Sequence, residues 1–234
     1  MKYVLFDVET ELIQGPLDLD RYVPAITVAA TLTHDGALDL WYDQDEMGRA
    51  TGRMLGRERT QDLVNFLQER AALGHVPVTW NGSGFDFRVL AQASGSVAEC
   101  AALAWQHIDM MFWLHCQKGF SVALDRAARA VGTRKMGGLS GADAPRLWAA
   151  GEYDQVMAYV AQDVRMLGAV YEGAAQARAL RWINTRGYES RADGELCSVR
   201  EAYRLPMPDT SWMSRPPWSR ERFVGWMLAA ERSS

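Results

Sequence analysis

Two carboxylates stand close together near the start of the chain, Asp7 and Glu9, at the end of the apolar, β-rich segment 2–8. Residues i and i+2 of a strand point to the same face, so both side chains should project together. Two adjacent carboxylates repel each other and are costly to bury, and a divalent cation removes that cost. The pair is therefore either a metal site or an exposed strand end.

A third carboxylate, Asp86, follows a glycine-rich turn. The segment 80–86 reads Trp-Asn-Gly-Ser-Gly-Phe-Asp, and it joins an apolar strand to a helix expected over 85–93. Asp86 could cap that helix, or it could face the carboxyl edge of the sheet, where open α/β sheets bind ligands. Gly82 and Gly84 would let the backbone come close to a substrate.

A fourth carboxylate, Asp163, lies in a long helical pattern expected over residues 152–181. Tyr159 precedes it by four residues, and positions i and i+4 share one face of a helix. The tyrosine hydroxyl and the carboxylate could therefore act at one point. The alternative is a core tyrosine next to a surface acid.

The apolar periodicities predict the elements that must position these side chains. Strands are expected at 2–8, 26–33, 37–43 and 76–80, with a short one near 107–109. Further helices are expected at 59–73, 97–105, 109–117 and 122–131, the last capped by Ser121. This order predicts an α/β domain with a mixed sheet flanked by helices.

The character of the chain changes after residue 181. Glycines and prolines break the remainder into short pieces, which we expect to be part hairpin and part loop. We therefore divide the chain into a domain at 1–181 and a Trp/Pro-rich C-terminal extension at 182–234, packed on the domain. The tryptophans of this extension either pack on the body or stack on bases of a single strand.

Composition limits the classes of function. The chain has 234 residues, 48% of them hydrophobic, and a formal net charge of −4. A protein that coats nucleic acid should be basic, so any nucleic-acid binding here must use a local patch. The densest basic run comprises Arg126, Arg129, Arg134 and Lys135, although a solvated helix face would look the same.

The cysteines and the apolar runs indicate in which cellular compartment the protein is expected. The 3 cysteines are far apart and form no CxxC pair, which argues against a disulfide framework or a zinc site and favours the cytoplasm. Apolar runs fall short of the roughly 20 residues that a membrane span needs, and the N-terminus lacks a signal-peptide layout. The histidines are scattered, and we interpret them as ordinary surface or core residues.

Taken together, the ordered motifs resemble the DEDD superfamily of 3′–5′ exonucleases, which includes polymerase proofreading domains and ribonuclease D. The resemblance covers residues 1 to about 175 and rests on three motifs: Asp-x-Glu ending the first strand, Asn-x-x-x-Phe-Asp beginning a helix, and Tyr-x-x-x-Asp late in the domain. It implies a ribonuclease H-like fold with a five-stranded mixed sheet. Tyr159 stands where the tyrosine subgroup, DEDDy, has its tyrosine, and Ala158 stands where the other subgroup has histidine.

The segment 80–90 is most similar to exonuclease domains of family B DNA polymerases, and the chain looks like a stand-alone relative of these. The resemblance implies that Asp7, Glu9, Asp86 and Asp163 bind two Mg²⁺ or Mn²⁺ ions and that Tyr159 orients the attacking water. Contacts to the strand are implied for Thr10, Asn81, Phe85, Arg134 and Lys135. The residues after the first motif, Glu11-Leu12-Ile13-Gln14, depart from the small residue common in the family, which puts the contacts to the terminal nucleotide in doubt.

The implied function is a 3′–5′ exonuclease that hydrolyses single-stranded DNA and releases nucleoside 5′-monophosphates. An exoribonuclease is the main alternative, because the catalytic residues do not discriminate DNA from RNA. A non-catalytic nucleic-acid-binding module on the same fold is a further alternative, although such a module would be expected to lack one or more of the acids. An endonuclease of the ribonuclease H type would leave the Tyr-x-x-x-Asp motif unexplained. The sequence gives no indication of protein partners.

Overall fold

The computed structural model describes residues 1–15, 17–133 and 141–233. Its centre is a five-stranded sheet with the order β3-β2-β1-β4-β5. The strands are β1 Tyr3–Thr10, β2 Ile26–Thr33, β3 Leu38–Tyr42, β4 Val76–Thr79 and β5 Ile108–Asp109. β1 pairs with β2 in antiparallel and with β4 in parallel orientation, so the predicted mixed sheet is confirmed.

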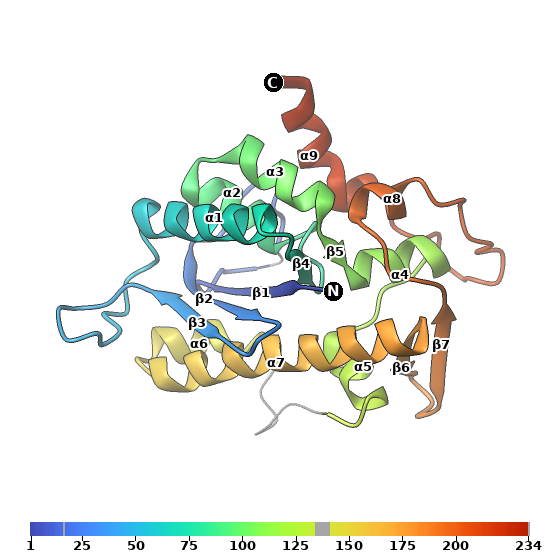
Figure 1. Cartoon of the computed structure of the whole chain (residues 1–234), viewed down its shortest axis with the longest axis horizontal. Coiled ribbons are helices and arrows are strands. Elements are labelled where there is room, and N and C mark those ends of the chain that lie inside the picture. Colours follow the sequence, from blue (N-terminus) through green and yellow to red (C-terminus); the bar gives the residue numbers. More distant parts are fainter. Residues whose placement is uncertain (16, 134–140, 234) are drawn as a thin grey trace.

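Helices cover both faces of this sheet (Figure 1). On one face lie α1 Arg57–Ala72, α2 Asp86–Ser94 and α3 Val97–Gln106. On the other lie α5 Leu124–Ala130, α6 Ala144–Ala149 and α7 Tyr153–Ala177, while α4 Met110–Lys118 follows β5 directly. The predicted α/β class, with helices flanking a five-stranded sheet, is confirmed.

The central strand β1 is buried from both sides, because α7 packs on one face of the sheet and α2 on the other. Val4, Leu5 and Phe6 are almost fully inaccessible to solvent. At Gly168 of α7, an added Cβ would lie 2.9 Å from Leu5 Cδ1, so a larger residue would force the end of the Leu5 side chain to move. Since Gly168 lies little more than one turn after Asp163, this close contact also brings that carboxylate towards β1.

The turn after β4 is held by a buried carboxylate, Asp109, at the end of β5. Its Oδ1 accepts hydrogen bonds from the backbone N–H groups of Asn81 (2.9 Å) and Phe112 (3.0 Å). Its Oδ2 accepts from the N–H of Ser83 (3.0 Å) and from the Ser83 hydroxyl (2.6 Å). One side chain therefore fixes the turn that leads into α2 and also caps the start of α4.

Close packing explains the glycines of this turn. An added Cβ would lie 2.2 Å from Thr79 Oγ1 at Gly82 and 2.6 Å from Asn81 Oδ1 at Gly84. Asn81 itself adopts a left-handed conformation with φ 74°, which asparagine tolerates better than most residues. The glycines are thus required by the fold of the turn, whatever they contribute to binding.

Two predicted helix boundaries are wrong. The long helix ends at Ala177, four residues before the expected end, because Arg178 adopts a left-handed conformation with φ 48°. Residues 179–181 then form part of a strand, β6 Ala179–Ile183. Ser121 does not cap the following helix, because α5 begins at Leu124 and has Ala123 at its N-cap position.

The C-terminal extension contains helices as well as the predicted hairpin. β6 pairs with β7 Glu189–Asp193, and α8 Val199–Tyr203 and α9 Glu221–Ser233 follow. The expectation of hairpin and loop alone was therefore wrong. Because the hairpin spans residues on both sides of 181/182, the division into 1–181 and 182–234 remains a prediction.

Two polar anchors join the extension to the rest of the chain. The buried Arg220 guanidinium donates to the carbonyl oxygens of Tyr203, Leu205, Pro206 and Cys116, the last of which lies in α4. Trp226 Nε1 of α9 donates to the Ser83 carbonyl at 2.7 Å, within the turn after β4. Among the described residues, we find no helix with the length and apolarity needed to cross a membrane.

Replacing Asp109 by asparagine should destabilise the protein. The amide nitrogen of asparagine cannot accept, so at least one buried donor of the turn loses its partner, at a cost of about 2–4 kcal/mol in the free energy of unfolding. Urea denaturation of Asp109→Asn measures this loss. The matched control is Asp62→Asn on the exposed face of α1, expected to change stability by less than about 0.5 kcal/mol. Equal stability of the two variants would contradict the role of Asp109.

Candidate metal centre

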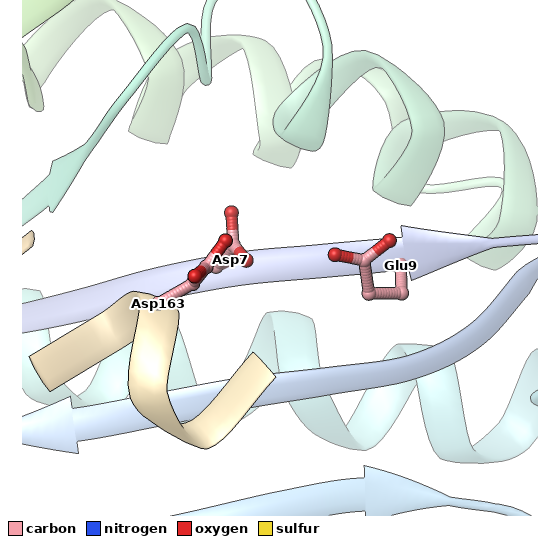
Figure 2. Close-up of side chains that lie close together, drawn as sticks. All are labelled: Asp7, Glu9 and Asp163. Atoms are coloured by element: carbon pink, nitrogen blue, oxygen red, sulfur yellow. The ribbon is translucent and has the colours of Figure 1, made fainter. Parts of the chain in front are cut away.

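Three of the four predicted acids meet at one point. Asp7 and Glu9 project from β1, and Asp163 reaches towards them from α7 (Figure 2). Each offers a carboxylate oxygen, and these oxygens all lie within 4.8 Å of one another. The i, i+2 spacing on the strand and the close packing of α7 on β1 are together sufficient to produce this cluster.

The cluster has the chemistry of a site for a hard cation. Glu9 and Asp163 are 9% and 7% exposed, and Asp7 is half-buried. Carboxylates brought this close with little water around them repel one another, and a divalent cation would offset the repulsion. Ligands that are all oxygen suit Mg²⁺ or Mn²⁺ rather than softer metals. The residues present therefore fit such an ion.

Tyr159 lies beside this cluster, one turn before Asp163 on α7. Its hydroxyl hydrogen-bonds with the Asp163 carboxylate. Burial of the ring raises the pKa of Tyr159 well above its ordinary value, and the negative charges of Asp163, Glu9 and Asp7 raise it further. In the absence of metal the phenol is therefore protonated at neutral pH and can donate a hydrogen bond.

Asp86 is placed differently from the other three acids. It is buried at the start of α2, and its Oδ1 accepts a hydrogen bond from the Val8 N–H at 3.0 Å, between Asp7 and Glu9. β4 pairs with β1 only as far as Leu5, so the backbone edge at Val8 is left open to this side chain. Burial raises the pKa of Asp86 to about 7, and the Asp109 carboxylate adds to that effect.

The predicted substrate-binding residues fall in three separate parts of the chain. Thr10 is buried at the end of β1, where the pairing with β2 shifts register between Glu9 and Thr10. Asn81 and Phe85 line a cavity of about 990 Å³ beside the turn after β4. Arg134 and Lys135 lie outside the described residues.

Residues that position the site, above all Asp109, were not predicted from the sequence. A signal was present, because Asp109 directly precedes a helical pattern and aspartate is a favoured N-cap. The hydrogen bonds of Asp109 to the turn at residues 81–83 connect segments far apart in the sequence, and no local pattern could have indicated them. The contact from Trp226 to Ser83 was missed for the same reason.

Burial of Asp86 predicts a pH dependence of stability in the absence of metal. Because its pKa is raised in the folded state, the unfolded chain loses this proton first, and stability falls as pH rises from about 4 towards 7. Asp86→Asn removes this dependence and keeps an oxygen to accept from Val8. In EDTA, we compare the free energies of unfolding of the variant and of the unaltered protein. As pH rises from acidic to mildly alkaline, this difference should shift in favour of the variant by at most about 4 kcal/mol. Thermal unfolding across this range measures the difference, and a constant difference would contradict the assignment.

Comparison with known proteins agrees with this fold. A sequence model of the RNase H superfamily matches residues 36–175. No curated protein sequence gives a significant match. Among solved structures, the family B DNA polymerase from the hyperthermophilic archaeon Pyrobaculum calidifontis is similar, with 19% identity and a TM-score of 0.54.

That match covers 74% of this chain and 24% of the polymerase, so the chain spans about a quarter of the polymerase's length. At this identity the likeness concerns the fold, and it confirms at that level the expected similarity to family B polymerases. The family match extends over more than half of the sequence, from β3 through α7 except its last residues. This chain is thus a member of the RNase H superfamily.

Proposed function

We propose that this protein is a metal-dependent 3′–5′ exonuclease of the DEDDy type that hydrolyses single-stranded DNA and releases nucleoside 5′-monophosphates. The observation that carries the proposal is the convergence of Asp7, Glu9 and Asp163 beside the Tyr159 hydroxyl. Membership of the RNase H superfamily supports nuclease activity and a nucleic-acid substrate.

Two further observations favour an exonuclease over other nucleases. The three motifs follow one another in the order and spacing of the DEDD exonucleases, and Tyr159 occupies the position of the subgroup tyrosine. The solved structure reported above is a family B DNA polymerase, the class whose exonuclease domains the segment 80–90 most resembles. The choice of DNA as substrate rests on this likeness.

The acids would hold two Mg²⁺ or Mn²⁺ ions, with Asp7, Glu9 and Asp163 as direct ligands and Asp86 acting through water. When bound, such ions lower the pKa of a water molecule and stabilise the negative charge that develops on the leaving oxygen. The bond from Val8 to Asp86 fixes that carboxylate next to the strand that carries Asp7 and Glu9.

Tyr159 orients the reactants by donating a hydrogen bond. Its phenol has one proton, which Asp163 accepts in this structure. When cations hold the Asp163 carboxylate, the hydroxyl would instead donate to an oxygen atom of the attacking water or of the phosphate and hold it in line for displacement. The i, i+4 spacing places Tyr159 and Asp163 on one face of α7, where their side chains interact. Asn81 and Phe85, at the cavity beside the turn after β4, would contact the end of the strand.

Replacing Asp7 by asparagine should abolish cleavage with little effect on folding. The substitution removes a charged ligand from the centre of the cluster, and the expected loss is at least about 10³-fold in kcat/KM. The assay uses end-labelled single-stranded DNA, single-stranded RNA and duplex DNA, each with Mg²⁺, Mn²⁺ or EDTA. Shortening from the 3′ end that requires metal is the expected result, and faster cleavage of RNA would identify an exoribonuclease. Full activity of Asp7→Asn would refute the assignment.

Replacing Tyr159 by phenylalanine should lower kcat and leave KM nearly unchanged. The ring still fills its place in the core, but the hydroxyl that orients the reactants is gone, at a cost of roughly 10²-fold. Steady-state kinetics on single-stranded DNA measure the effect. Tyr171→Phe on the same helix is the matched control, because its half-buried hydroxyl lies away from the acids and contacts Met1 Sδ. Equal turnover by the two variants would exclude this role for Tyr159.

A further inference from the structure

The C-terminal extension forms one wall of the cavity that Asn81 and Phe85 line. We call this cavity of about 990 Å³ the extension groove. One wall consists of Asn81, Phe85 and Arg88 and the other of Trp218, Arg222 and Trp226. Phe85 directly precedes Asp86, whose carboxylate binds the backbone between Asp7 and Glu9. The groove therefore borders the start of α2, the element that carries Asp86.

Trp218 presents a large aromatic surface on a fixed backbone. Its side chain is 55% exposed, an unusual state for an indole. Its carbonyl oxygen nevertheless accepts a hydrogen bond from Nε2 of the buried His115 at 2.9 Å. The guanidinium of Arg222 lies over one face of the ring, with its carbon 4.3 Å from the centroid, so a base would stack on the other face. An exposed ring held in this way would lose little conformational entropy when a ligand stacks on it.

The charges of the groove favour bases over phosphates as its occupant. Arg88 hydrogen-bonds to Asp20, which also lines the groove, so its charge is largely compensated. The hydrogen bond and the charge of Arg88 lower the pKa of the Asp20 carboxyl group, and the charge of Arg222 adds a smaller effect. Arg222 is also adjacent to Glu221 along the chain. A groove with both signs of charge and exposed aromatic surface suits the flat, neutral faces of nucleobases.

We propose that the extension groove binds the unpaired bases of the strand that lead to its 3′ end, with Trp218 as a stacking platform. The proposal rests on the nuclease function proposed above and assigns to the extension a part in binding single strands. Because every base has a π face, such a platform tolerates any sequence but requires that the bases be unpaired.

A second exposed tryptophan of the extension provides a matched control. Trp212 is 65% exposed, but its Nε1 donates to the Asp209 carbonyl and its ring packs edge-on against Phe120. It is not among the residues that line the groove. Replacing either tryptophan by alanine removes a similar exposed ring from the same extension, so the comparison isolates the position of the ring.

The test measures binding of a fluorescein-labelled single-stranded oligodeoxynucleotide by fluorescence anisotropy in EDTA, where cleavage cannot occur. Trp218→Ala should bind about tenfold more weakly than the unaltered protein, a typical cost for one lost stacking contact. Trp218→Tyr should retain most of the affinity, and Trp212→Ala should bind like the unaltered protein. Thermal unfolding of each variant verifies that the fold is intact.

A second measurement locates the base on the strand, and its first part uses the unaltered protein alone. A single abasic site is moved stepwise from the 3′ end of the oligonucleotide. One position should weaken binding to the unaltered protein about tenfold and leave binding to Trp218→Ala unchanged, because the same contact is already lost. Equal affinities of Trp218→Ala and Trp212→Ala, or an abasic scan without any sensitive position, would overturn the proposal.

The outcomes also separate this proposal from the nuclease function. If the protein cleaves single strands but Trp218→Ala binds them as tightly as the unaltered protein, the nuclease function stands and the groove assignment is wrong. If binding depends on Trp218 but no strand is cleaved with Mg²⁺ or Mn²⁺, the groove assignment stands and the nuclease assignment is wrong. Failure of the unaltered protein to bind any single strand in EDTA would overturn the groove assignment, and failure to cleave any strand with Mg²⁺ or Mn²⁺ would overturn the nuclease assignment.

Discussion

Repulsion among the carboxylates of Asp7, Glu9 and Asp163 is the constraint around which this domain is organised. Oxygen atoms of all three lie within 4.8 Å of one another, and two of the side chains are largely buried. Such crowding costs free energy, which the surrounding fold must supply or a cation must offset. The rigid elements that carry the acids, a central strand and a long helix packed on it, prevent the side chains from moving apart.

The supporting contacts come from outside the motifs. Gly168 lets α7 lie close to Leu5, and Asp109 holds the turn from which α2 begins. α2 in turn places Asp86 on the open edge of β1, where the early end of β4 leaves the Val8 N–H without a strand partner. The position of each acid is thus fixed by neighbours that carry no chemistry of their own, as is usual for a preorganised site.

The C-terminal extension is joined to this same region by specific polar contacts. Trp226 donates a hydrogen bond to the Ser83 carbonyl, within the turn that Asp109 holds. The buried Arg220 donates hydrogen bonds to carbonyl oxygens of the extension and of α4. A segment fixed in this way can contribute a stable wall to a groove. That arrangement accounts for an exposed indole at Trp218 whose backbone is held against a buried histidine.

The sequence by itself determined the types of chemistry and the local elements that carry them. The i, i+2 spacing of Asp7 and Glu9 and the i, i+4 spacing of Tyr159 and Asp163 are properties of a strand and a helix, and the apolar periodicities predicted the sheet and its flanking helices. Only the tertiary structure decided that Asp163 meets Asp7 and Glu9 while Asp86 lies apart on the Val8 N–H, and that α7 ends at Ala177. The roles of Asp109 and Trp226 and the helix α9 likewise emerged only from the fold. The physical reason is that residue spacing records contacts within one element, whereas hydrogen bonds and packing between distant segments depend on how the whole chain is arranged.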